Sequence, residues 1–192
     1  MTSAPSRREE LLEAAVGYLV RNGVADMSLR PMAAAIGTSA RLLIYHFGTR
    51  EALLLDAMAI VRTRARQEVE AMLGTGAEHR DLGRLLRTLW RWCTSAKNRP
   101  YLRLIFEVQG LALQNPDRYR AYLEGSVDHW IELLSSTLRP SFRRDAQAAA
   151  TLMVGAVDGL LMDFLSSGDL RRTSLALDLL ADHLSSRRRR RP

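Results

Sequence analysis

The sequence is poor in cysteine and has no long uncharged apolar run. Its one cysteine, Cys93, excludes an intramolecular disulfide and favours a reducing compartment. The longest uncharged apolar stretch, about Ala146 to Val157, is too short to cross a bilayer. Arginine and glutamate are mixed near the N-terminus, which argues against a signal peptide. We therefore expect a cytoplasmic protein with no membrane segment.

Signatures of catalysis and of cofactor binding are missing as well. The sequence has no glycine-rich phosphate loop, no nucleophile elbow and no paired His/Glu motif, and its four histidines are scattered. These absences disfavour an enzyme and predict no metal and no cofactor. With 192 residues, of which 47% are hydrophobic and 26% charged, the chain is long and apolar enough for one folded domain, or for two small ones that share a core.

The positive charge is concentrated at the two ends of the chain. The first 50 residues contain six arginines against four acidic residues, and the run Arg187–Arg191 lies near the C-terminus. Between them, residues 51–186 balance, with 17 basic and 17 acidic residues. A neutral body with a basic N-terminal part indicates that only this part meets an anion.

Apolar residues recur with helical spacing along almost the whole chain, and no alternating strand pattern is found. Capping residues and glycines divide the pattern into about nine helices, so the expected fold class is all-α. The expected helices cover about 7–22, 29–36, 40–46, 50–73, 82–93, 100–113, 116–138, 144–165 and 173–184.

Prolines and capping residues set several of these boundaries. Ser6 and Glu9 form a capping box, and Thr49 can cap the long fourth helix. Asn115 and Pro116 are expected to open the seventh helix, with proline in its first turn, and Pro140 is expected to interrupt it.

Two short helices joined by a tight turn at residues 37–39 are typical of a helix-turn-helix, at about residues 28–47. In this motif the second helix enters the major groove of DNA and presents its first residues to base edges. Ala40 and Arg41 fit that position, while Leu43 and Phe47 are expected to pack inward. The segment therefore predicts a double-stranded DNA partner.

The run from Gly37 to Phe47, with the closing Tyr45-His46-Phe47 and then Arg50, resembles the N-terminal domain of the TetR family of regulators. The resemblance covers about residues 6–53. Ile44 stands where the family usually has a phosphate-contacting tyrosine, and Arg50 stands where it usually has lysine. The predicted DNA-contacting residues are Ser28, Thr38, Ser39, Ala40, Arg41, Tyr45, His46 and Arg50.

The resemblance also implies a C-terminal helical domain, residues 54–186, for dimerisation and for binding an unidentified small-molecule effector. The predicted pocket residues are Trp90, Cys93, Phe106, Gln109, Tyr122 and Trp130. The predicted homodimer interface contains Ala149, Gly155, Ala156 and Gly159 on the apolar eighth helix. The alternative is that this helix is the buried centre of one monomer. Residues 187–192 are predicted to be a disordered basic tail, with nonspecific DNA contact as the alternative.

Together these features predict a dimeric repressor that binds a palindromic operator and releases it when an effector binds. An activator, or an architectural DNA-binding protein without an effector, is the alternative that the sequence leaves open. Asp158 and Asp163, on the same apolar helix, are candidates for hydrogen bonds between helices or across the dimer.

Overall fold

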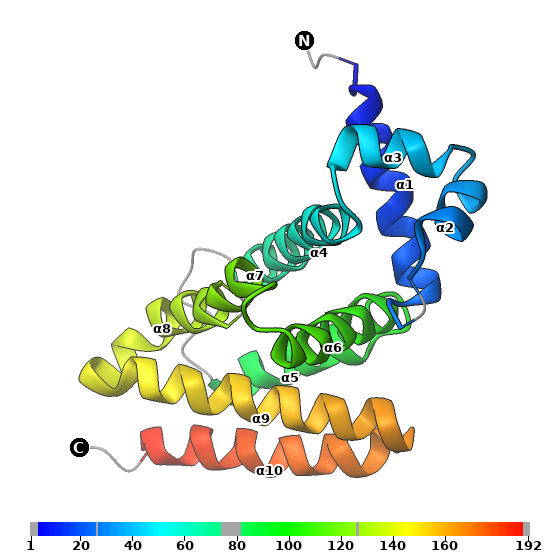
Figure 1. Cartoon of the computed structure of the whole chain (residues 1–192). Helices are drawn as coiled ribbons and strands as arrows, with labels where there is room; N and C mark the ends of the chain where they lie inside the picture. The colour runs from blue at the N-terminus through cyan, green and yellow to red at the C-terminus, as the bar shows by residue number, and fades with distance from the viewer. Residues whose placement is uncertain (1–3, 26, 74–81, 126, 190–192) are drawn as a thin grey trace. The chain divides into compact units, whose positions relative to one another are not determined.

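The computed structural model describes residues 4–25, 27–73, 82–125 and 127–189. The regular elements of these residues are helices, joined by turns and short loops (Figure 1). This confirms the all-α fold class. The elements are α1 (Arg7–Asn22), α2 (Leu29–Ala35), α3 (Ala40–Phe47), α4 (Arg50–Leu73), α5 (Leu82–Thr94), α6 (Arg99–Gln114), α7 (Arg120–Glu124), α8 (Asp128–Phe142), the short 3-10 helix η2 (Arg143–Asp145), α9 (Ala146–Ser167) and α10 (Leu170–Arg189).

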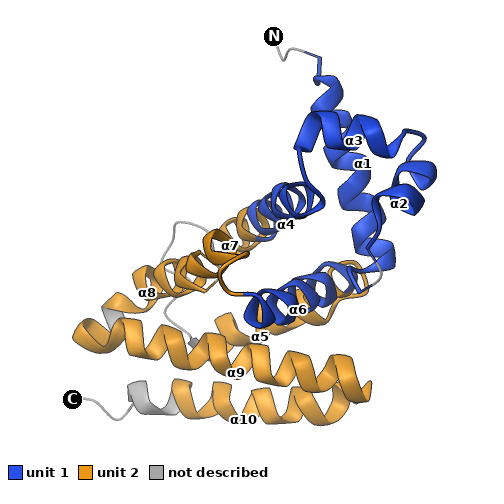
Figure 2. Cartoon of the chain, in the orientation of Figure 1, with its two compact units in different colours: residues 1–65, 100–115 blue, residues 66–99, 116–192 orange. Residues whose placement is uncertain are grey.

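The chain divides into two compact units (Figure 2). The first contains residues 1–65 and 100–115, and the second contains residues 66–99 and 116–192. Helix α6 therefore belongs with the N-terminal helices, although the sequence places it in the middle of the chain. The boundary at residue 53 marks the end of the family resemblance and stays a prediction.

In the first unit, α1 supplies much of the core. Its predicted capping box is present: the Ser6 hydroxyl accepts from the Glu9 N–H, and the Glu9 carboxylate accepts from the Ser6 N–H at 2.6 Å. One face of α1 is buried, and burial of each large aliphatic side chain contributes about 1.5–3 kcal/mol. The buried residues of this face are Leu11, Leu12, Ala15, Val16, Leu19 and Val20.

In the second unit, α5 packs against α9 and α10, and α9 packs against α8. Figure 1 shows α9 and α10 side by side, joined by a short turn. The turn is made at Gly168, whose φ of +72° suits glycine, and its N–H donates to the carbonyl of Phe164. The Trp90 indole of α5 donates to the Ser174 hydroxyl of α10 at 2.8 Å.

Three expectations about helix ends are wrong. Pro116 does not open a helix: residues 116–119 form a turn, and α7 begins at Arg120. The expected helix 116–138 is divided into α7 and α8. Pro140 does not end α8 either, because a proline near the C-terminus removes only one bond of the last turn, and the helix continues to Phe142.

The C-terminal helix is longer than expected. Helix α10 runs to Arg189, so it includes residues 187–189, and the disordered tail stays a prediction. Arginine is a good helix former, which is consistent with the longer helix. The rest of the predicted tail lies outside the described residues.

Helix α9 is the most apolar element of the described chain. With the preceding turn it forms a segment, Arg143–Ser167, that is long and apolar enough to cross a membrane by length and composition. The expectation from the sequence was too strict here, because it ended the apolar stretch before Asp158. Only 22% of the apolar window is buried, so most of this surface is not covered by the rest of the described chain.

Candidate nucleic-acid interface

Helices α2 and α3 are joined by a tight turn. Gly37 adopts a φ of +71°, and the Thr38 N–H donates to the carbonyl of Ala33 at 2.8 Å. The Ser39 hydroxyl then caps α3 by accepting from the Leu42 N–H at 3.1 Å, as the sequence predicts. The turn thus fixes where α3 begins and which of its faces is exposed.

The two faces of α3 differ sharply. Leu43 and Phe47 are buried against the rest of the unit. Ile44 and Tyr45 are exposed, with 80% of Tyr45 accessible, and Arg41 is exposed beside them. Residues three and four apart share one face of a helix, so Arg41, Ile44 and Tyr45 form a single outward surface. In the described part of the chain, Arg41 has no hydrogen-bond or ion-pair partner.

The hydroxyl groups around the turn have different surroundings. Ser28 precedes α2 at the N-cap position and is exposed, but its side chain makes no capping bond. The Thr38 hydroxyl oxygen is buried and has no hydrogen-bond partner among the described residues. A buried, unpaired hydroxyl costs free energy, and such groups are uncommon in folded proteins.

Arg50 begins α4 and is held by the protein on two sides. Its Nη1 donates to the carbonyl of Met27 at 2.9 Å, and its Nε donates to the carboxylate of Glu51 at 3.0 Å. The side chain remains 42% exposed. The family resemblance predicts a phosphate contact here but gives no sign of the bond to Met27, because that bond joins residues 23 apart in sequence.

His46 is half-buried at the end of α3. Its ring meets the Tyr45 ring edge-on, with centroids 5.1 Å apart. Its carbonyl accepts from Arg8, whose guanidinium also lies over the Phe47 ring and pairs with Asp56 at 2.5 Å. Arg8 therefore ties α1 to α3 and α4.

A second ion pair joins α1 to α4. Both terminal nitrogens of Arg64 donate to the carboxylate of Glu13. These hydrogen bonds lower the pKa of Glu13 below its ordinary value. The cross-links made by Arg8 and Arg64 give α3 a fixed support, which motif analysis of the sequence does not predict.

The six predicted pocket residues are divided between the two units. Phe106 and Gln109, on α6, are half-buried in the first unit. In the second unit, Trp90, Cys93 and Tyr122 are buried and Trp130 is half-buried. Burial raises the pKa of Cys93 to about 12, which keeps its thiol protonated. Whether the six line one pocket stays a prediction.

A groove of about 810 Å³ is lined by residues of α8, η2 and α9 in the second unit. None of the six predicted pocket residues lines it. Arginines at the end of α8 and in η2 and acidic residues of α8 contribute charges of both signs. The lining residues are Asp128, Ile131, Glu132, Ser135, Arg139, Arg143, Arg144, Ala146 and Gln147.

The predicted dimer residues lie along α9. Gly155 and Gly159 are exposed, and Ala149 and Ala156 are half-buried. Leu152 and Met162 of the same helix are 62% and 53% exposed, and Leu175 and Leu179 of α10 are 56% and 74% exposed. Helix α9 is thus not the buried centre of one monomer, which was the alternative from the sequence.

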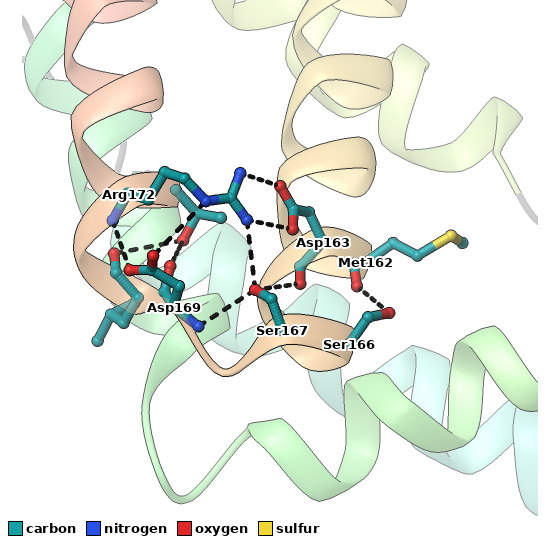
Figure 3. A network of polar contacts seen from close by, with 8 residues as sticks. Met162, Asp163, Ser166, Ser167, Asp169 and Arg172 are labelled. Atoms are coloured by element: carbon teal, nitrogen blue, oxygen red, sulfur yellow. Dashed lines mark hydrogen bonds and ion pairs between the residues drawn. The ribbon is translucent and has the colours of Figure 1, made fainter.

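Asp163 and Asp158, both on α9, have opposite surroundings. Arg172 of α10 donates to both carboxylate oxygens of Asp163, at 2.7 and 2.6 Å, within a network that includes Ser167 and Asp169 (Figure 3). These bonds lower the pKa of Asp163. Asp158 has no ion-pair partner among the described residues. Although solvent reaches the residue, the protein around its carboxyl raises the pKa to about 6.

A short capped helix that exposes one face and is supported by two further helices has the architecture of a helix-turn-helix DNA-binding domain. The model of the family described as bacterial regulatory proteins, tetR family, matches residues 11–57. The chain is 26% identical over 176 residues to the HTH-type transcriptional regulator BetI 1 of Chromohalobacter salexigens, over 81% of this chain and 77% of the relative.

Solved structures share the whole fold. A transcriptional regulator from Rhodococcus matches with a TM-score of 0.79 and 18% identity, over 97% of this chain and 100% of the other. The multidrug binding protein EbrR, complexed with imidazole, matches with a TM-score of 0.68 and 24% identity, over 94% and 91%. Residues 11–57 thus match the model of the TetR family, and over most of its length the chain is similar to HTH-type transcriptional regulators. Regulators of this family bind DNA operators and form dimers.

Proposed function

We propose that the protein is a homodimeric repressor that binds a palindromic operator with α3 of each protomer and leaves it when a small molecule binds. The observation that carries the DNA-binding part is the outward face of α3. It presents an exposed guanidinium, Arg41, and an exposed phenol, Tyr45, on a helix whose start is fixed by the Ser39 cap. Arg41 can form hydrogen bonds with a guanine base. The candidate contacts to the sugar–phosphate backbone of the DNA are Ser28, Thr38, Ala40, His46 and Arg50.

The dimer is proposed from the uncovered apolar surface of α9 and α10. Its exposed leucines and methionine would be covered by the same surface of a second copy, as expected for a two-fold symmetric interface. The exposed Gly155 and Gly159 would let the two α9 helices approach closely. Dimerisation would cover this surface without a membrane, in keeping with the proposal of a cytoplasmic DNA-binding protein.

The effector part of the proposal rests on linkage. A small molecule that prefers the conformation with displaced α3 helices must weaken operator binding by its differential affinity for the two conformations. The likeness to a protein described as multidrug binding supports a small organic molecule as the effector. The buried aromatic side chains Trp90 and Tyr122 are the candidate contacts in the second unit.

Selection of bound fragments from the parent genome tests the function, followed by an operator–reporter assay with and without the gene. Repression predicts an enriched palindromic site and higher reporter expression when the gene is deleted. Lower expression on deletion would indicate an activator, and no change at a bound site would favour an architectural protein. No enriched fragment would contradict operator binding.

A further inference from the structure

Helix α6 reaches the DNA-binding helices through one carboxylate. The Glu107 Oε2 atom accepts from the Val24 N–H at 2.9 Å, in the loop between α1 and α2. The two residues are 83 positions apart in sequence, yet both belong to the first unit. Val24 is buried, and the Glu107 side chain is 31% exposed. The bond therefore joins a distant helix to a loop next to the helix-turn-helix.

The loop is shaped to receive this carboxylate. Gly23 ends α1 at a φ of +73°, a conformation that favours glycine. A Cβ at Gly23 would lie 3.1 Å from the carboxyl carbon and from Oε1 of Glu107, and closer still to Oε2. Glycine thus supplies both the turn and the space in which the Glu107 carboxylate sits.

The same loop continues to the start of α4 by two more hydrogen bonds. The Val24 carbonyl accepts from the Met27 N–H at 3.1 Å, and the Met27 carbonyl accepts from Nη1 of Arg50 at 2.9 Å. Glu107, Val24, Met27 and Arg50 therefore form one chain of bonds. These bonds lie next to the start of α2 and the start of α4. They therefore hold the chain on both sides of the helix-turn-helix.

We propose that Glu107 is a positioning residue for DNA binding: its carboxylate holds the α1–α2 loop, and through that loop it sets α2 and α3 for the operator. The inference rests on the proposed function, since it assumes that α3 reads an operator. A displacement of α6 that withdraws Glu107 would release the loop and loosen α3. Glu107 thus makes α6, and not only α4, a route by which the rest of the protein controls DNA binding.

The test compares wild type with Glu107→Ala, Glu107→Gln and Arg103→Ala on a genome-selected fragment and on a scrambled duplex. Arg103 pairs with Glu107 along α6 at 3.5 Å and serves as the control for loss of that pair. Glu107→Ala is expected to lose about tenfold in operator affinity and little on the scrambled duplex. Glu107→Gln keeps an acceptor oxygen and is expected to stay within about threefold of wild type, as is Arg103→Ala.

Removal of a negative charge favours DNA binding by itself, so a loss with Glu107→Ala cannot come from net charge. The effect of operator binding on hydrogen exchange at the Val24 amide is a second measurement. A contact that only stabilises the fold would not link this exchange to the operator through Glu107. By reciprocity, operator binding should slow this exchange in wild type and not in Glu107→Ala. Equal operator affinity of wild type and Glu107→Ala, no rescue by Gln, or Val24 exchange unaffected by the operator would overturn the inference. A wild type that binds no selected fragment would instead overturn the proposed function.

Discussion

Arg41 and Arg50 carry the same charge in different surroundings. Arg41 points outward from the first turn of α3 with no partner among the described residues, whereas Arg50 is fixed by Met27 and Glu51. A free guanidinium in the major groove can bind guanine O6 and N7, a contact worth about 1–3 kcal/mol of discrimination. A guanidinium held at the base of a helix suits a phosphate.

Arg41→Ala should therefore weaken the discrimination between bases at one base pair of each operator half-site. Its affinity for nonspecific DNA should change little. Arg50→Ala should weaken all sequences alike and make the salt dependence shallower by about one phosphate per protomer. It should also lower the melting temperature, because the bond to Met27 is lost. Binding to operator and scrambled duplexes at several salt concentrations measures both effects. Uniform weakening by Arg41→Ala, with no base position relaxed, would contradict its role in reading bases.

Two aspartates of α9 should give opposite dependences of stability on pH. The pKa of Asp158 is raised from 3.8 to about 6 because the surrounding protein partly desolvates its carboxyl, so between these values the folded state holds a proton that the unfolded state has lost. The free energy of unfolding contributed by Asp158 therefore falls as pH rises through this range. The pKa of Asp163 is lowered by Arg172, so its contribution is present above 3.8 and is lost as pH falls.

Asp158→Asn should raise the melting temperature near pH 8 and change little near about pH 4, where both forms are neutral. Asp163→Asn, the matched control on the same helix, should lower the melting temperature near pH 8. Thermal melts from about pH 4 to 8 measure both variants. If the melting temperature of Asp158→Asn at pH 8 is no higher than that of wild type, the charged form of Asp158 is not destabilised in the folded protein.

At the scale of elements, Gly83 lets α5 approach α10 closely. A Cβ at this position would lie 2.7 Å from the backbone carbonyl oxygen of Ala181 and would also meet the Ser185 hydroxyl. A backbone carbonyl cannot move aside as a flexible side chain can. The approach of these two helices therefore depends on the absence of a side chain at residue 83.

Gly83→Ala should destabilise the protein by about 1–3 kcal/mol, since the clash outweighs the gain in helix propensity. Gly110→Ala is the control: it is also helical, nothing lies within 4 Å of its added Cβ, and it should stabilise by up to about 1 kcal/mol. Urea unfolding measures both. Equal stability of the two variants would mean that α5 and α10 separate easily.

The elements differ in how far the sequence predicts them. Those with a local signal follow the prediction: the capping box of α1, the Ser39 cap, and the Thr49 hydroxyl, which accepts from the Ala52 N–H at 3.0 Å. Pro116 and Pro140 were misleading because proline is tolerated in turns and near helix ends, so it marks a boundary only within a few residues.

The candidate site was predicted only where its residues are neighbours in sequence. The motif around α3 locates the exposed face, but Glu107 has no local signal that distinguishes it from any other glutamate on a helix. Its role depends on Gly23 and Val24, which are about 80 residues away and approach it only in the folded chain. The bond of Arg50 to Met27 was missed for the same reason.

At the scale of the whole molecule, the uncovered face of α9 predicts a dimer in which large side chains cannot be placed at the centre of the α9–α9 contact. Apart from the neighbouring residues and the helix backbone itself, no atom of the described chain lies within 4 Å of a Cβ added at Gly155 or Gly159. The fold of the monomer should therefore accept Gly155→Leu and Gly159→Leu. Any loss of assembly must then come from a second copy. Light scattering should show monomers or aggregates for these variants and dimers for wild type and for the control Gly110→Leu. Normal dimers of both α9 variants would place the interface elsewhere.

The central claim is that the helix-turn-helix of a dimer binds DNA, and the salt dependence of affinity for a genome-selected duplex tests it most directly. If the dimer neutralises about four to six phosphates, log K plotted against log[salt] should fall with a slope of about −0.9 for each. A scrambled duplex should bind more weakly at every salt concentration, because it lacks the base contacts of α3. Affinity that does not change between low and high salt, or that is equal for both duplexes, would contradict the account.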